Sequence, residues 1–487
     1  MRRPEILARA IGRRGRWGLA TAVACGLAGC SFAPPYHVPD APKPLEQYKE
    51  LGDWKVAQPQ DGEARGRWWL AYNDAELDEL ENKIPSNLSL KAAFARLEQA
   101  RAQYRISRAD LFPNIVADPY AMRERFSQNA PKSLPGYPST VNDFLVGADF
   151  SYEVDLWGRV RNEVASARAS RQASAADYAL LELSMRAQLA EDYFNLRSDD
   201  AQSRLLDKTV SDYERSLKLT TDLFNGGAAA LADVAQAQAQ LDNSRTQAAE
   251  IKLQRAQVEH AIAVLVGENP SAFSLPFNAL SIDVVPPPID PGLPSTLLER
   301  RPDVAEAERR VASANAQIGV ARAAYFPKIT LAATGGVEST KTSNLFNMPS
   351  SYWSAGPQVS VPIFEGGRLV AETDRVKAVY REEVADYRNT VLAAYQDVED
   401  NLIALRQLAE ESVTDAAAVL ATGVALKQAQ DRYQAGIVTF LEVSTAETAS
   451  LQAQVQAVTI QARRMSASVL LVKALGGGWE AGALTKQ

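Results

Sequence analysis

An internal duplication restricts the possible folds of this sequence more than any other feature. The motif Leu-Phe-Pro-Asn-Ile at residues 111–115 recurs 214 residues later as Tyr-Phe-Pro-Lys-Ile. Beyond it, matching pairs such as Gly267 and Gly476 keep an offset of 209 residues. A Pro-rich linker, residues 284–299, separates the two copies. We therefore expect a first repeat over residues 87–283 and a second over residues 300–475.

Each copy predicts the order helix, strand, strand, helix, helix. The expected helices are 88–111, 159–224 and 231–266 in the first copy, and 302–325, 368–433 and 440–475 in the second. Asn87 is a possible N-cap, Pro302 suits a first helical turn, and Gly267 and Gly476 are expected stops. Each long helix would extend about 100 Å, and the two shorter helices stacked end to end would nearly match it. A globular domain does not need helices of this length.

Alternating polar and apolar residues predict strands at about 113–157 and 327–365. Residues 147–156 alternate strictly, and this run approaches the roughly 9–11 residues of a membrane-crossing strand. Residues 329–337 and 353–363 alternate likewise, whereas 115–126 alternate poorly and contain Pro119. A soluble sheet with one solvated face would give the same pattern. In lipid, four strands would leave two open edges, so a pore would require several chains to share one barrel.

The first 29 residues read as a lipoprotein signal peptide. Six Arg residues precede an apolar run that ends in Leu-Ala-Gly-Cys, so we expect cleavage before Cys30 and lipidation of that residue. An ordinary secretory signal with an incidental Cys is the alternative. Cleavage would remove six Arg and one Glu and change the net charge from −7 to −12, which disfavours nucleic acid as a partner. With Cys25 in the signal and only His37 and His260 as histidines, we expect no disulfide, no metal site and no cofactor other than the lipid.

Several motifs together resemble the TolC family of outer-membrane factors. They are the duplicated Phe-Pro after an Ala-rich helix, Trp68-Trp69, the stretch Glu-Arg-Arg-Pro-Asp-Val-Ala-Glu-Ala-Glu at 299–308, and Lys-Ala-Leu-Gly-Gly-Gly-Trp at 473–479. The lipobox narrows the resemblance to the NodT-like and OprM-like lipoproteins. The resemblance implies a mostly α fold with a membrane β-barrel: three protomers would form a 12-stranded barrel and a long periplasmic α-helical barrel. Residues 30–86, the linker and the tail, 476–487, would form a belt around the helices.

The resemblance also implies a function. Members of the family carry substrates out through the outer membrane after an inner-membrane transporter loads them through a periplasmic adaptor. We therefore expect a homotrimeric, passive exit duct whose partners are an adaptor (membrane fusion) protein and an inner-membrane efflux pump of the proton-driven RND type. It would lie in the outer membrane, anchored by the lipid on Cys30, and Ser31 is compatible with that destination. The substrate is not encoded in any motif of the sequence.

In the family, the turns between the long helices and the helices that follow them are the periplasmic tips that meet the adaptor. Here these turns contain Gly226, Gly227 and Gly436, and glycine suits a tight turn between antiparallel helices.

Just inside the tips, the family narrows the duct with acidic side chains. Glu442 falls on such a position, so three copies would form a carboxylate ring that attracts cations. Asp233 and Tyr433 match positions whose contacts hold the prototype closed. Thr445 replaces a second acidic residue and Val438 replaces a tip arginine of the prototype, which puts gating by an Arg–Asp link in doubt. The alternative for Glu442 is a solvated residue at a helix start.

Two other classes of protein compete with the duct. An enzyme would need a metal cluster, a nucleophile elbow or a phosphate loop, and the sequence offers none of these motifs. A lipid-anchored periplasmic coiled-coil scaffold or adaptor without a pore fits the anchor and the heptad-like long helices, but not the strands at matching positions in both copies. We therefore favour the exit duct and expect no enzymatic activity.

Overall fold

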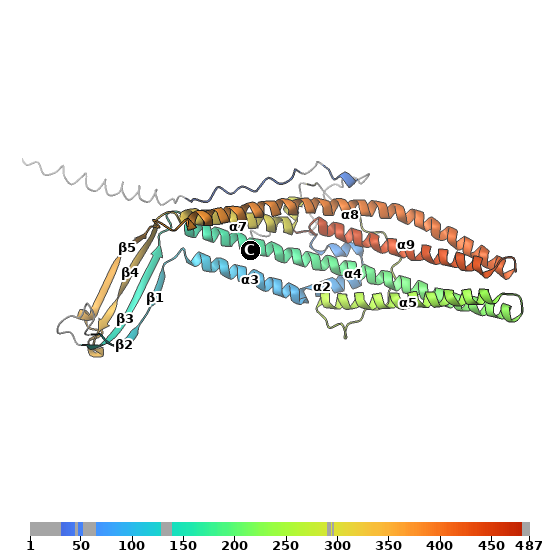
Figure 1. Cartoon of the computed structure of the whole chain (residues 1–487), viewed down its shortest axis with the longest axis horizontal. Helices are drawn as coiled ribbons and strands as arrows, with labels where there is room; N and C mark the ends of the chain where they lie inside the picture. The colour runs from blue at the N-terminus through green and yellow to red at the C-terminus, as the bar shows by residue number, and fades with distance from the viewer. Residues whose placement is uncertain are drawn as a thin grey trace, which may run out of the picture. The chain divides into compact units, whose positions relative to one another are not determined.

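The computed structural model describes residues 31–43, 47–51, 65–127, 139–289, 294 and 297–479 (Figure 1). The expected signal peptide, Cys30 and the last eight residues of the expected tail lie outside these described residues. The chain divides into two compact units. Unit 1 combines Met1–Asp40, Glu98–Ala173 and Ala307–Tyr387, and unit 2 combines Ala41–Leu97, Ser174–Glu306 and Arg388–Gln487. Within the described part of the chain, every helix is too short or too polar to cross a membrane.

All six predicted helices form, with ends within two residues of the predicted ones. They are α3 (Leu88–Ala109), α4 (Arg159–Asn225) and α5 (Leu231–Val266) in the first copy, and α7 (Pro302–Ala323), α8 (Arg368–Gln434) and α9 (Phe440–Ala474) in the second. Both short helices end earlier than expected, because a proline follows in each Phe-Pro motif and disfavours helical backbone before it. The same turn closes both, with Phe112 N donating to Ala109 O and Phe326 N to Ala323 O.

In unit 2 the shorter helices meet end to end, as their lengths predicted. Asn87 accepts hydrogen bonds from the first backbone N–H groups of α3 and donates to Val264 O and Leu265 O at the end of α5. In the second copy the buried Arg301 donates to Ala474 O at the end of α9 and pairs with Asp303 of α7. Each junction therefore satisfies carbonyls that a helix end would otherwise leave unpaired.

Unit 1 contains one antiparallel sheet of five strands. They are β1 (Asn114–Ala117), β2 (Tyr120–Arg125), β3 (Thr140–Glu153), β4 (Lys328–Ser339) and β5 (Ser351–Ser360). The predicted partner run breaks into β1 and β2 because Pro119 falls between them. Both pieces pair with β3, β3 pairs with β4 of the second copy, and β4 pairs with β5. The two copies are thus joined through the β3–β4 ladder.

The register of the sheet places apolar and polar side chains on opposite faces. Neighbouring rows across three strands are Phe150, Ala333 and Ala355, then Asp149, Thr334 and Ser354. Successive residues of a strand point to opposite faces, so one face carries the aromatic and aliphatic residues and the other carries carboxylates, hydroxyls and glycine.

The main core of unit 2 joins the N-terminal segment to the long helices. Short helices η2 (Arg65–Tyr72), α2 (Ala75–Lys83) and η3 (Ile84–Ser86) place Trp68, Trp69 and Leu77 against Tyr193 and Leu196 of α4. The guanidinium of Arg186 lies over the Trp69 ring at 4.6 Å and also binds Glu81. The start of the tail packs nearby in the same unit, where Trp479 contacts Ala176 and Ala305.

Candidate functional site: the hairpin tips

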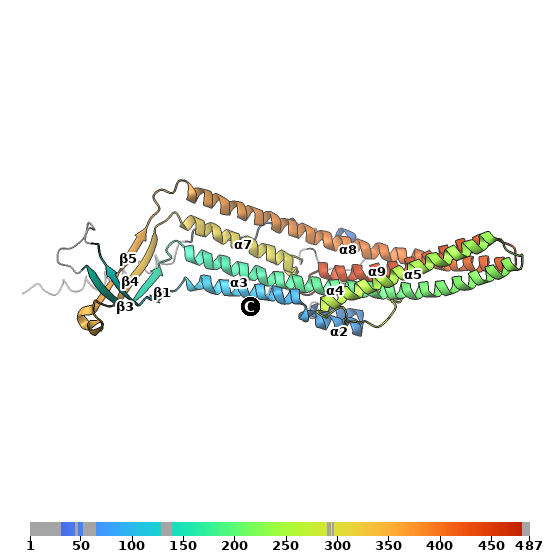
Figure 2. The same ribbon diagram turned by 60° about the horizontal axis from the view of Figure 1, so that its bottom comes forward.

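Two helical hairpins end close together in unit 2, α4–α5 and α8–α9 (Figure 2). Their turns have the same geometry, because Ala228 N donates to Leu223 O in the first and Ile437 N to Arg432 O in the second. These are the long hydrogen bonds of a Schellman motif, which requires one residue with positive φ. Gly227 (φ 77°) and Gly436 (φ 70°) supply it. The predicted glycine turns are therefore confirmed as turns, and their role toward an adaptor is taken up below.

A small apolar core holds the four helices together just inside these turns. Its buried members are Ala237 of α5, Ala429 and Tyr433 of α8, and Phe440 and Val443 of α9. Leu217 and Leu223 of α4 pack against it. The rings of Tyr433 and Phe440 meet edge to face with centroids 5.5 Å apart, which fixes the start of α9 against the end of α8.

Four side-chain hydrogen bonds link one hairpin to the other near this core. They are Tyr433 Oη to Thr220 Oγ1 (3.2 Å), Ser216 Oγ to Glu447 Oε1 (3.3 Å), Gln236 Nε2 to Ser444 Oγ (3.3 Å) and Gln240 Nε2 to Thr448 Oγ1 (2.9 Å). Moving one hairpin away from the other within a protomer would break all four. These four hydrogen bonds are therefore candidates for the contacts that limit how wide a duct formed by these hairpins can open.

The three residues assigned to the aperture are not brought together. Glu442, half-exposed in the first turn of α9, forms an ion pair with Arg432 of α8. Asp233 accepts a hydrogen bond from the backbone N–H of Ala230 at the start of α5, and among the described residues no hydrogen bond joins it to Tyr433. Tyr433 instead bonds to Thr220. Sequence reasoning missed Arg432 and Thr220, because neither residue stands at a position that the resemblance marks.

Glu447 is a buried carboxyl group that the sequence did not single out. It is 4% exposed, and its Oε2 finds no hydrogen-bond partner among the described residues. Burial, assisted by repulsion from Asp212, raises the pKa of Glu447 to about 7, although the hydrogen bonds from Ser216 and Gln430 oppose the shift. A signal was present in the sequence, since Glu447 lies one helical turn from Val443 on the inward face of α9.

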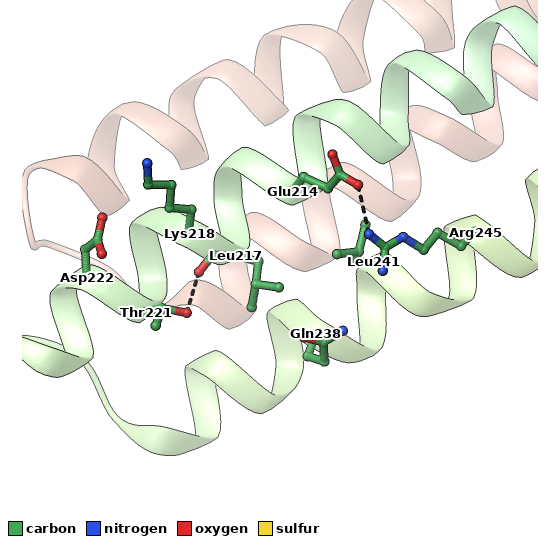
Figure 3. Close-up of a pocket in the computed structure, with 8 residues that line it drawn as sticks. All are labelled: Glu214, Leu217, Lys218, Thr221, Asp222, Gln238, Leu241 and Arg245. Carbon is green, nitrogen blue, oxygen red and sulfur yellow. Dashed lines mark hydrogen bonds and ion pairs between the residues drawn. The ribbon is translucent and has the colours of Figure 1, made fainter.

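A groove of about 450 Å³ runs along the first hairpin beside its tip (Figure 3). Leu217 and Leu241 line its floor between α4 and α5. Charged groups surround them, and Glu214 pairs with Arg245 at 2.8 Å across the two helices. At the tips themselves Leu231, Ile437 and Leu441 are each more than 60% exposed. The tips therefore offer an apolar surface with charges behind it.

A second candidate site lies in unit 1, where the mature N-terminus would begin. Ser31 Oγ donates to Asn162 of α4, and Arg322 of α7 donates to the carbonyl of Phe32. The Phe32 ring stacks on Phe326 with centroids 4.3 Å apart, and Trp157 completes the cluster. The residue next to the expected lipidation site is therefore held against the ends of the β-hairpin segments. No group of three or more His, Cys, Asp or Glu suited to a metal occurs in the described ranges.

Long helical hairpins, combined with one antiparallel sheet that both copies build and that has one apolar face, define a channel protein of the outer-membrane efflux type. A family model described as outer membrane efflux protein matches residues 80–268 and 293–477, and the chain belongs to this family. It is an outer-membrane exit duct of tripartite efflux systems, and the expected fold class, function and location are confirmed.

Several curated relatives are similar over nearly their whole length. The toluene efflux pump outer membrane protein TtgC of Pseudomonas putida is 32% identical over 93% of both chains. The cation efflux system protein CusC of Escherichia coli is 30% identical over 94% of this chain and 98% of its own. The pyoverdine export outer membrane protein OpmQ of Pseudomonas aeruginosa is 34% identical over 85% and 88%.

Two solved structures show the same fold. The CmeC outer membrane channel of Campylobacter jejuni superimposes with a TM-score of 0.84 at 26% identity, over 94% of this chain and 98% of its own. The open state of the MtrE outer membrane channel of Neisseria gonorrhoeae superimposes with a TM-score of 0.77 at 29% identity, over 93% and 99%. These likenesses extend over both units.

Proposed function

We propose that three copies of this chain form one passive duct, that its hairpin tips receive a periplasmic adaptor, and that lipid on Cys30 anchors it. The observation that carries the proposal is the sheet of unit 1. Its outer strands, β1 with β2 on one side and β5 on the other, have no partner among the described residues. Unpaired strand edges are too costly to leave in lipid.

The strand order supports closure by copies of the same chain. β1 and β5 run in opposite directions, because three antiparallel pairings separate them. β5 of one copy can therefore pair antiparallel with β1 and β2 of the next. Three copies contribute twelve strand positions in this way, above the roughly eight of the smallest bacterial barrels. Trp353, which is 82% exposed on the apolar face, would then meet lipid.

The exposed surface of the tips supports the inference that an adaptor binds there. The adaptor would link the duct to an inner-membrane pump, which we infer is of the RND type. Leu231 and Ile437 expose apolar surface at both turns, and the Leu217–Leu241 groove extends that surface along the first hairpin. An apolar patch with a charged rim is the usual composition of a protein interface. Relatives at similar identity bear names that refer to toluene, cations and pyoverdine. We infer that the pump, and not the duct, selects the cargo.

Glu442 would form a ring of three carboxylates, each paired with Arg432 of its own protomer. The pair leaves little net charge while it is intact. Substituting Glu442→Ala would leave three unpaired guanidinium groups, so the preference of the duct for cations over anions should fall. The reversal potential of single channels in a salt gradient measures this preference, and Glu410→Ala, an exposed carboxylate of α8, is the matched control.

The anchor is supported by the placement of its neighbours. Phe32 stacks on Phe326, which also stacks with Trp157, and aromatic clusters of this kind favour the membrane–water interface. A lipid on the preceding residue would then reach the membrane directly. Cys30→Ser should abolish incorporation of labelled palmitate, and unchanged labelling would remove the anchor from the proposal.

The first experiment is the native mass of the mature protein, extracted from outer membranes in mild detergent. Three protomers in one particle that conducts ions in a planar bilayer are expected. A stable monomer would leave the β1, β2 and β5 edges open, and the shared barrel would have to be abandoned for a lipid-anchored scaffold. We propose no catalytic activity for the chain.

A further inference from the structure

A second groove of unit 2, separate from the tips, lies among α4, α5 and α9 and has a volume of about 370 Å³. Asp199 and Gln202 line it from α4, Gln254 and Val258 from α5, and Thr459 and Ala462 from α9. Its size is within the range of sites that take small molecules.

Asp199 is the unusual member of this lining. Its residue is only 8% exposed, and its carboxylate makes no hydrogen bond or ion pair with any group of the described chain. The adjacent Asp200, by contrast, is fully engaged with Arg197 and Arg255. Buried carboxylates are normally hydrogen-bonded or paired, because burial of an unpaired charge is costly. Asp199 therefore presents an uncompensated acceptor to the groove.

Three other polar side chains of the groove each donate a hydrogen bond within their own helix. Gln202 Nε2 donates to Ser198 Oγ (3.2 Å), Gln254 Nε2 to Glu250 Oε1 (3.2 Å) and Thr459 Oγ1 to Val455 O (2.9 Å). The amide oxygens of both glutamines accept no hydrogen bond from a described residue, so the lining offers these acceptors together with the carboxylate of Asp199. A ligand with several N–H donors and a positive charge matches this set.

The charged side chains around Asp199 do not neutralise its carboxylate as such a ligand would. On α4, Asp200 repels it. On α5, Arg255 attracts it but is bound to Asp200 and Glu259. On α9, Arg463 at the edge of the groove pairs with the exposed Glu411 of α8 at 3.5 Å. Burial, with repulsion from Asp200 and against attraction by Arg255, raises the pKa of Asp199 to about 6.

The groove opens away from the segments that cross these helices. Gln461 donates to Val284 O of the linker, and residue 461 lies about 200° around α9 from both Thr459 and Arg463. On α4, Arg197 donates to Pro276 O, and it lies about 200° around that helix from Asp199. The linker and the loop after α5 therefore occupy the opposite faces of α9 and α4.

We propose that this groove binds a small organic cation, an alkylammonium whose head group pairs with Asp199 while its hydrocarbon part packs on Val258 and Ala462. Binding at this groove does not depend on the proposed function. Only one consequence rests on that function: in a closed duct, the groove would hold cationic cargo at the wall. A metal ion is less suitable, since one carboxylate with neutral oxygens offers no cluster of three acidic or histidine ligands among the described residues.

Isothermal titration of the purified full-length protein with n-butylammonium chloride tests the site, with n-butanol as the uncharged probe and potassium chloride at equal ionic strength. We expect saturable binding of butylammonium on the order of millimolar and none of butanol. Binding should strengthen from pH 5 to pH 7, because Asp199 becomes ionised over this interval. Equal heats from potassium, or no saturable heat from butylammonium, would overturn the proposal.

Asp199→Asn keeps the shape of the side chain and removes its charge, and it should weaken binding at least tenfold. Asp207→Asn is the matched control, because Asp207 is an exposed carboxylate of the same helix paired with Lys252. Unchanged affinity in Asp199→Asn would overturn the proposal. If that variant does not fold, the comparison of butylammonium with butanol and the pH profile of the wild type still decide whether the site exists.

The native mass and conductance of the same preparation are measured separately. A conducting trimer that does not bind butylammonium contradicts the cation site alone, and a monomer that binds it contradicts the shared duct alone.

Discussion

At the scale of single residues, Glu447 shows how a tightly packed helix can make stability depend on pH. Its carboxyl group has an ordinary pKa of 4.5 and a pKa of about 7 in the folded protein. Between these values the folded state binds the proton more tightly than the unfolded state does. The contribution of this group to stability is therefore fully present below about pH 4.5 and is lost as the pH rises through 7.

Glu447→Gln removes this titration and keeps the hydrogen bond from Ser216. The variant should melt close to the wild type at pH 5 and at a higher temperature than the wild type at pH 8, with a gain on the order of 1–3 kcal/mol. Thermal melting followed by circular dichroism in detergent measures it. Glu410→Gln removes an exposed carboxyl and should leave the pH profile of the wild type unchanged. A constant difference between Glu447→Gln and the wild type at both pH values would rule out the buried, titrating carboxyl.

Elements meet at the two helix junctions, where a side chain from one helix satisfies the end of another. Asn87→Ala would remove the N-cap of α3 together with two hydrogen bonds to the end of α5. We expect a loss of about 1–2 kcal/mol of stability, seen as a lower melting temperature. Asn401→Ala, which breaks one exposed hydrogen bond within α8, is the control and should change the melting temperature little. Equal melting of the two variants would mean that the junction does not hold the helices together.

The contact between hairpins gives a second prediction at this scale. Tyr433→Phe removes only the hydroxyl that binds Thr220 of the other hairpin. If this bond restrains the tips, single-channel openings in a planar bilayer should become longer or larger. Tyr193→Phe is the matched control, because Tyr193 is also buried and its hydroxyl donates to Asp74, which belongs to neither hairpin. Openings changed equally by both variants would show that the loss of a buried hydroxyl, and not the link between hairpins, is responsible.

For the whole molecule, the expected behaviour is conduction without an energy source of its own. The chain belongs to the outer membrane efflux protein family. Purified wild-type protein should give a linear current–voltage relation in symmetrical salt, with no nucleotide and no proton gradient. A current that required either one would assign to this chain a role that the proposal gives to the pump.

The sequence by itself determined the helices, the glycine turns, the duplication and the alternating strands. Most of these are local features: helical periodicity, a proline after each short helix and a glycine in each hairpin turn act over a few residues, so they can be read without knowing the rest of the chain. For this reason the predicted ends of α4, α5, α8 and α9 differ from the observed ones by one residue or none. Pro119 and the poor alternation of residues 115–126 indicate a weak strand, and the structure shows that the strand is divided there.

Only the tertiary structure decided which side chains meet. Tyr433 and Thr220 are 213 residues apart, and Gln240 and Thr448 are 208 apart, so no local pattern announces either hydrogen bond. The resemblance marks Asp233 and Tyr433 only as positions whose contacts hold the prototype closed; the partners they have here, the backbone of Ala230 and the hydroxyl of Thr220, come from the structure. The burial of Glu447 and Asp199 was likewise hidden, because a carboxylate on a helix looks solvated until neighbouring helices cover it. Local chemistry selects the elements, and packing between distant elements then determines which polar groups lose water and which partners remain for them.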